Sequence, residues 1–148
     1  MNTSLANQSV VVLDTNVVLD LWVYADPATP VLLEALRRGQ VQWLSTSVMR
    51  DELARVLAYP HIVARMVSKS QVAADVLAQF DAFAQLQHVA PKAPYTCKDA
   101  DDQKFIDLAV AHRATLVSKD KAVLTMRNRL ARLGVTVVKA WQPGEAST

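Results

Sequence analysis

An unbroken run of hydrophobic residues, Val10 to Leu13, leads directly into the polar stretch Asp14 to Asn16. A run without alternating polar positions is typical of a strand that is buried on both faces. Such strands belong to parallel sheets covered by helices, and ligands bind beyond the carboxyl ends of their strands. Asp14 therefore stands where a functional side chain is expected.

The hydrophobic pattern of the remaining chain predicts three more strands, separated by helices. We expect the strands at 41–45, 115–118 and 135–140. We expect the helices at 15–22, 31–38, 47–59, 61–68, 71–87 and 99–113, with a last helix from Asp120 to Leu133. Strands joined through helices predict a three-layer α/β/α sandwich with a central parallel sheet. We expect one domain over residues 1–148, with a loose C-terminal tail at 141–148.

Composition agrees with a globular protein, because hydrophobic residues make up 51% and charged residues 20% of the chain. The net charge of +2 permits an anionic partner without requiring one. Cys97 is the only cysteine, which excludes an internal disulfide and fits a cytoplasmic location. Residues 1–9 lack the pattern of a signal peptide. The apolar stretch 10–24 contains acids and is too short to span a membrane.

Four acidic residues lie near the ends of predicted elements. Asp14 and Asp120 each follow a strand, Asp102 lies near the start of a helix, and Glu52 lies in the first turns of its helix. In a parallel sheet these positions meet at one edge, where four carboxylates would repel one another. A divalent cation relieves that repulsion, and oxygen ligands without histidine or cysteine favour Mg²⁺ or Mn²⁺.

Four segments in this order resemble the PIN-domain ribonuclease family. They are Val12 to Val17, Asp51 to Leu57 with Tyr59-Pro60, Lys98 to Phe105, and Leu116 to Lys121. The resemblance implies a metal-dependent endoribonuclease that hydrolyses RNA phosphodiester bonds with one or two Mg²⁺ or Mn²⁺ ions. The chain is most similar to bacterial toxin components of toxin–antitoxin pairs, which implies an antitoxin protein as partner. Since the family often forms dimers, it also implies a homodimer.

The resemblance also implies roles for individual residues. The catalytic and metal-binding acids match Asp14, Glu52, Asp102 and Asp120. Asn16 and Ser118 match polar residues that support these acids, and Asp99 matches a second acid of the subgroup. Lys119 departs from the family, in which glycine is common at this position, and it brings a cation into the sequence neighbourhood of the site.

A basic cluster follows the fourth segment of the resemblance. It consists of Lys119, Lys121, Arg127, Arg129 and Arg132. It is either a track for the RNA backbone or a solvated helix face, and the sequence leaves both open.

The helical pair 61–87 carries more apolar residues than one buried stripe needs, including Ile62, Met66 and Val67. We expect part of this pair to pack against a second copy or a partner protein.

Each functional assignment has a structural alternative. Asp14 and Asp102 could simply cap helices, and Glu52 could pair with Arg55 or Arg50. For the whole chain, the alternative to the nuclease is a PIN-like module that binds RNA or a protein without cleaving. A phosphoacceptor receiver domain is disfavoured because only one acid follows the first strand.

Overall fold

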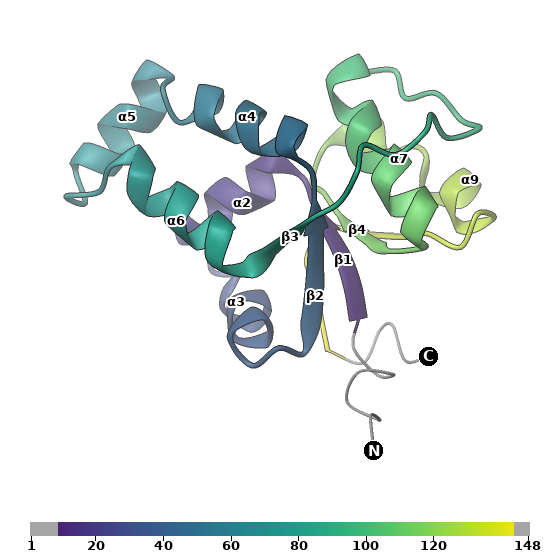
Figure 1. The fold of residues 1–148 in the computed structure, drawn as a ribbon, viewed down its shortest axis with the longest axis horizontal. Coiled ribbons are helices and arrows are strands. Elements are labelled where there is room, and N and C mark those ends of the chain that lie inside the picture. The colour runs from purple at the N-terminus through teal and green to yellow at the C-terminus, as the bar shows by residue number, and fades with distance from the viewer. Residues whose placement is uncertain (1–8, 144–148) are drawn as a thin grey trace.

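Residues 9–143 are described here from a computed structural model of the protein. The centre is a parallel five-stranded sheet in the order β3-β2-β1-β4-β5 (Figure 1). The strands are β1 (Ser9–Leu13), β2 (Val41–Ser45), β3 (Ala84–Leu86), β4 (Thr115–Val117) and β5 (Thr136–Val138). β1 lies in the middle, with Val11 opposite Trp43 of β2 and Leu13 opposite Val117 of β4. The residue that follows β1 therefore emerges at the centre of the sheet edge.

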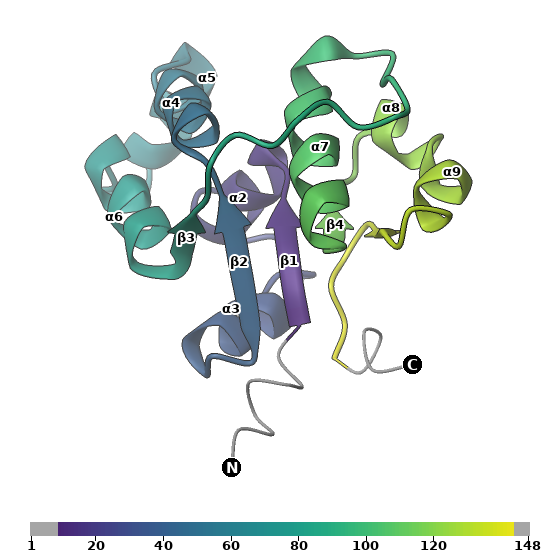
Figure 2. The ribbon, with the colours of Figure 1, turned by 45° about the vertical axis from the view of Figure 1, so that its right-hand side comes forward.

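Helices cover both faces of the sheet (Figure 2). One side carries α2 (Thr15–Trp22), α3 (Pro30–Arg37), α4 (Ser47–Val56), α5 (Pro60–Val67) and α6 (Ala73–Phe83). The other carries the 3₁₀ turn η1 (Ala100–Asp102), α7 (Gln103–His112), α8 (Lys121–Leu124) and α9 (Arg127–Ala131). Alternate β1 residues pack into different cores, because Val11 and Leu13 contact the first layer and Val12 the second. This arrangement confirms the predicted three-layer α/β/α fold.

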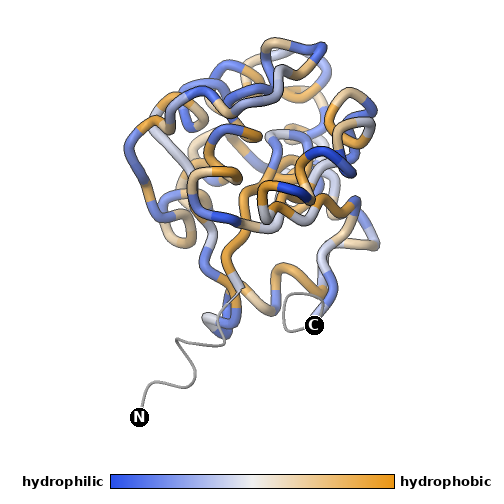
Figure 3. Tube along the Cα trace, turned by 90° about the vertical axis from the view of Figure 1, so that its right-hand side faces the viewer, coloured by the Kyte–Doolittle hydropathy of each residue, from blue (hydrophilic) through white to orange (hydrophobic). Residues whose placement is uncertain are grey.

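Aromatic side chains fill much of the first core. Trp43 of β2 stacks on Trp22 at 5.8 Å between ring centroids and meets Phe80 edge-on at 5.0 Å. Such pairs add directional packing to the hydrophobic burial of large rings. The trace coloured by hydropathy shows hydrophobic segments running through the middle of the molecule (Figure 3). A separate hydrophobic core thus lies on each face of the sheet, beneath the helices of that layer.

The prediction of one helix over 71–87 is wrong at its C-terminal end. α6 stops at Phe83, and Ala84–Leu86 forms β3 beside β2. The sequence from Val76 to Leu86 keeps a helical hydrophobic spacing, but backbone pairing to β2 determines the conformation of its last residues. A hydrogen bond of 2.7 Å from Gln42 Nε2 to Gln85 Oε1 joins the two strands. The sheet therefore has a fifth strand that the pattern did not predict.

Two other predictions near the C-terminus need correction. The single helix expected up to Leu133 is divided into α8 and α9, because Thr125 and the buried Met126 form the turn between them. Trp141, expected in a loose tail, is 6% exposed and packs into the first core. Residues 144–148 of the expected tail lie outside the described residues.

The apolar surplus on the helical pair 61–87 is smaller than expected. Ile62 and Met66 are buried within the chain itself. The exposed large apolar side chains of this segment are Val63, Val67, Val72 and Leu86, with Tyr59 beside them. Only Val67 of the three residues named from the sequence is thus available to a partner.

No helix between residues 9 and 143 is long and hydrophobic enough to span a membrane.

Candidate metal centre

Asp14 and Asp120 are brought together by the pairing of β1 with β4. The backbone N–H of Asp14 donates to the carbonyl of Val117 at 3.1 Å, which places the ends of the two strands side by side. Each aspartate is also the N-cap of the helix that follows it. Asp14 accepts from the backbone N–H of Asn16 at 3.4 Å, and Asp120 from that of Ala122 at 2.9 Å. Strand pairing and helix capping thus orient both carboxylates.

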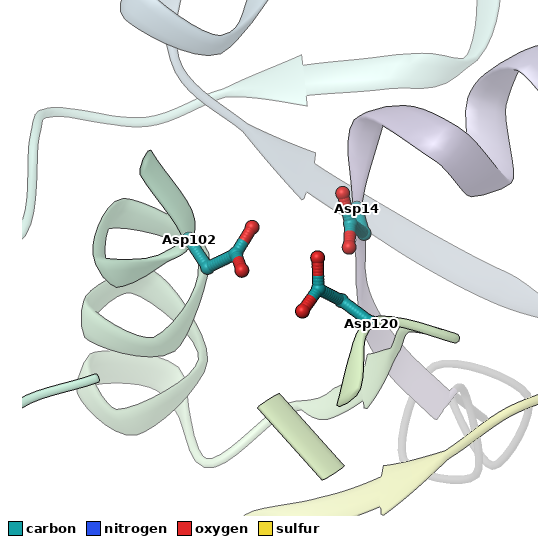
Figure 4. A group of neighbouring side chains, drawn as sticks. All are labelled: Asp14, Asp102 and Asp120. Atoms are coloured by element: carbon teal, nitrogen blue, oxygen red, sulfur yellow. The ribbon is translucent and has the colours of Figure 1, made fainter. Parts of the chain in front are cut away.

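Asp102 completes the group from the other side of the sheet edge. It ends η1 and precedes α7, which packs on β1 and β4. One carboxylate oxygen each of Asp14, Asp102 and Asp120 lies within 4.8 Å of the other two. The three side chains converge on a shared space although they are distant in sequence (Figure 4). This confirms that the sheet edge gathers three of the four predicted acids.

Ser118 connects two of these aspartates. Its hydroxyl donates to Asp14 Oδ2 at 2.7 Å and accepts from the backbone N–H of Asp120 at 3.1 Å. Ser118 is completely buried, so no water competes for these hydrogen bonds. Ser118 therefore holds the Asp14 carboxylate and the backbone of Asp120 in place.

The negative charge of the three aspartates is not neutralised by the protein. Within residues 9–143, no lysine, arginine or histidine forms an ion pair with any of them. Burial, together with the charges of Asp14 and Asp120, raises the pKa of Asp102 from 3.8 to about 7. Burial also raises the pKa of Asp14, and the hydrogen bond from Ser118 opposes that rise.

Asp102 shows most directly that a cation fits this space. Its side chain makes no capping hydrogen bond to α7, and its buried Oδ2 atom has no hydrogen-bond partner among residues 9–143. Asp102 therefore stands at the N-terminus of α7 without capping it through a side-chain hydrogen bond. Buried polar atoms are almost always satisfied, and hard carboxylate oxygens without nitrogen or sulfur donors suit Mg²⁺ or Mn²⁺. The donor set thus fits a hard divalent ion held by Asp14, Asp102 and Asp120.

Glu52 lies outside this group of three. Its Oε1 accepts from the Thr15 hydroxyl at 2.6 Å, and its Oε2 accepts from Lys104 Nζ at 3.0 Å. The expected ion pair with Arg55 or Arg50 is wrong, because Lys104 takes that role and Arg50 pairs with Asp81. The negative charge of Glu52 still reaches Asp14, whose pKa it helps to raise.

The two other supporting residues lie at the rim. Asn16 is exposed, and it is its backbone N–H that contacts Asp14. Asp99 is exposed and caps η1 by accepting from the backbone N–H of Asp101 at 3.0 Å. The charge of Asp99 adds to the rise in the pKa of Asp102.

The basic residues near Asp120 differ in their surroundings. Lys119 Nζ lies 2.5 Å from Asp20 Oδ2 and 3.8 Å from Asp26 Oδ2, so its charge does not pair with the aspartate cluster. Arg129 lies over the ring of Tyr95, 5.9 Å from its centroid. Lys121 and Arg127 are exposed at the starts of α8 and α9.

A family model described as PIN domain matches residues 10–122, which cover the cluster, β2, β3 and β4, and β1 apart from Ser9. The chain belongs to the PIN domain family. PIN domains are typically nucleases, use divalent metal ions and act on RNA. Comparison with functionally curated proteins finds no match. The family and the carboxylate cluster therefore agree on the class of chemistry.

Sequence reasoning missed Lys104 as a residue of this region. It lies two positions after Asp102, inside a segment that resembles the family. It is also three positions after Asp101, whose carbonyl it can reach within one helical turn. That spacing was the available signal, but the contact with Glu52 spans 52 positions and depends on tertiary structure.

Proposed function

We propose that this PIN domain is a Mg²⁺- or Mn²⁺-dependent endoribonuclease that hydrolyses RNA phosphodiester bonds. The supporting observation is the group of three aspartates that share one space without a neutralising basic side chain from residues 9–143. The unpartnered Oδ2 of Asp102 adds to this support. A non-cleaving module would have no need to keep three repelling carboxylates at this cost in stability.

The proposed roles follow from the positions of the side chains. Asp14, Asp102 and Asp120 hold the metal, and Glu52 is a fourth acid beside them. Asp99, Asn16 and Ser118 support the aspartates. A divalent ion bound there supplies a positive charge that polarises the phosphate and lowers the pKa of a water. Ser118 keeps Asp14 oriented, and Lys121, Arg127 and Arg129 contact the RNA backbone. Lys119 also belongs to this basic surface, because its side chain is 47% exposed. Its ammonium pairs with Asp20, so we assign it a smaller share of the RNA contact.

The test compares the parent with Asp102→Asn and a matched control, Asp101→Asn. Purified protein is incubated with structured and unstructured RNAs in Mn²⁺, in Mg²⁺ and in EDTA. We expect cleavage by the parent and by the control in either metal, and none by Asp102→Asn or in EDTA. Asp101 is exposed, so the control removes a neighbouring charge outside the cluster. RNA binding without metal-dependent cleavage would favour the non-cleaving module.

We further propose that the nuclease is the toxin of a toxin–antitoxin pair and acts in the cytoplasm. The support is the resemblance of its four segments to that subgroup. Induced expression in a bacterial host should stop growth, and Asp102→Asn should abolish this effect. A short neighbouring reading frame encoding a DNA-binding protein, whose product restores growth, would identify the antitoxin.

We also propose that the chain forms a homodimer through the exposed side chains of Tyr59, Val63, Val67 and Val72. Tyr59 precedes α5, Val63 and Val67 lie on it, and Val72 precedes α6, so the exposed apolar side chains gather around α5 and the start of α6. Light scattering at micromolar concentration should give twice the mass of the chain. A monomer under these conditions would contradict the proposal.

A further inference from the structure

A chain of hydrogen bonds joins the neighbour of Asp14 to the neighbour of Asp102. Thr15, which follows Asp14, donates through its hydroxyl to Glu52 Oε1 at 2.6 Å. Lys104 Nζ donates to Glu52 Oε2 at 3.0 Å and to the carbonyl oxygen of Asp101 at 2.5 Å. Asp101 directly precedes Asp102. We call Thr15, Glu52 and Lys104 the positioning bridge, because together they link α2, α4 and α7.

The positioning bridge is shielded from solvent. The side chains of Lys104 and Glu52 are 23% and 17% exposed, whereas those of the surface pair Arg38 and Glu34 are 66% and 51% exposed. Thr15 is buried, and Lys104 Nζ also lies 5.0 Å from the ring centroid of Phe105. Shielded, hydrogen-bonded charges hold their geometry better than exposed ion pairs, which are mobile and weak.

Asp102 needs such an external constraint. Its own side chain makes no capping bond, and repulsion from Asp14 and Asp120 acts to move it away. Asp14 and Asp120 are fixed by strand pairing and by Ser118, but no strand carries Asp102. The link from Lys104 to the carbonyl of Asp101 is therefore a direct restraint beside Asp102.

We propose that Thr15, Glu52 and Lys104 set the separation of Asp14 and Asp102, and thereby strengthen metal binding without contacting the ion. Lys104 is then a positioning residue, and Glu52 acts through this bridge. The inference rests on the proposed metal site. It opposes the simple electrostatic expectation, under which the positive charge of Lys104 repels a cation. The two accounts predict opposite signs for the effect of removing Lys104.

The test measures the Mn²⁺ dissociation constant of the full chain by calorimetry. Thr15→Val removes one hydroxyl without changing charge, and Lys104→Met removes the ammonium. We expect each to weaken Mn²⁺ binding about tenfold, the typical effect of residues that orient metal ligands. Lys104→Arg should recover part of the loss. Lys98→Met is the matched control, because Lys98 is an exposed lysine beside Asp99 and outside the bridge. It should bind Mn²⁺ at least as tightly as the parent.

The combined Thr15→Val/Lys104→Met variant tests whether the residues act as one unit. We expect its loss of affinity to be close to the larger single loss, since either change already breaks the bridge. Melting curves in EDTA establish that each variant is folded. Unchanged or tighter Mn²⁺ binding by Lys104→Met and Thr15→Val would overturn the bridge. A parent protein that binds no Mn²⁺ would instead overturn the proposed metal site.

Discussion

The neighbouring residues Lys119 and Asp120 belong to two different acidic regions. The first region is paired with a basic side chain, and within residues 9–143 the second is not. Asp20 and Asp26 receive the ammonium of Lys119 at 2.5 and 3.8 Å. Asp120, the next residue, turns to Asp14 and Asp102, where no basic side chain pairs with the carboxylates in the described part of the chain. The ion pair with Lys119 neutralises the acids of the first region, which gives them a structural role. The three carboxylates of the second region still repel one another, which is typical of functional sites.

The largest expected effect comes from removing one carboxylate of the unneutralised region. Asp102→Asn should lower RNA cleavage by at least about 10³-fold, or roughly 4 kcal/mol in the activation barrier. It should also abolish most of the stabilisation by saturating metal, which is roughly 2.7 kcal/mol at a hundredfold excess over the dissociation constant. Melting temperatures with and without Mn²⁺ measure the second effect. Full activity in this variant would show that Asp102 is not a residue of the metal site.

The free energy of unfolding should depend on pH because of the unneutralised region. The folded-state pKa of Asp102 is raised from 3.8 to about 7, so its protonated form stabilises the metal-free fold at low pH. This contribution falls as the pH rises from about 4 to about 7 and is absent above that range. We expect a loss of roughly 2–4 kcal/mol across this window. Unfolding in EDTA should show a larger loss for the parent than for Asp102→Asn, in which the raised pKa of Asp14 remains. An equal pH dependence in both proteins would contradict this origin.

Removing the cation of the neutralised region should have a smaller effect. Lys119→Met leaves Asp20 without its ion pair, although the Asp20 side chain is only 13% exposed. We expect a loss of about 1 kcal/mol in unfolding free energy, because Lys119 itself is half exposed. Mn²⁺ affinity should stay close to that of the parent. A large change in affinity would show that the two regions are coupled.

The smallest expected effect concerns RNA affinity away from both regions. Replacing Arg127 and Arg129 with alanine should weaken RNA binding equally for all sequences. The slope of log affinity against log salt should fall by about 1.4, since each phosphate contact on a single strand contributes about 0.7. Binding titrations at several salt concentrations measure this slope. An unchanged slope would identify this part of α9 as a solvated helix face.

The sequence predicted most elements because local patterns specify them. The run Val10 to Leu13 forms most of β1, and the prediction of 41–45 matches β2 in full. Thr46 caps α4 by accepting from the Met49 N–H, and threonine is a residue that favours this position. β3 was missed because its short segment continues a helical spacing, and only pairing with β2 makes it a strand. Trp141 was misplaced for a similar reason, since its burial depends on a core built from distant segments.

For the site, the sequence by itself determined which acids follow strands and begin helices, and thus predicted Asp14, Asp102 and Asp120. It could do so because strand ends in a parallel sheet share one edge. Tertiary structure decided the partners of the long charged side chains. Lys119 reaches Asp20 and Lys104 reaches Glu52, across 99 and 52 positions of the chain. A flexible lysine can reach several acids, so packing, not sequence distance, selects its partner.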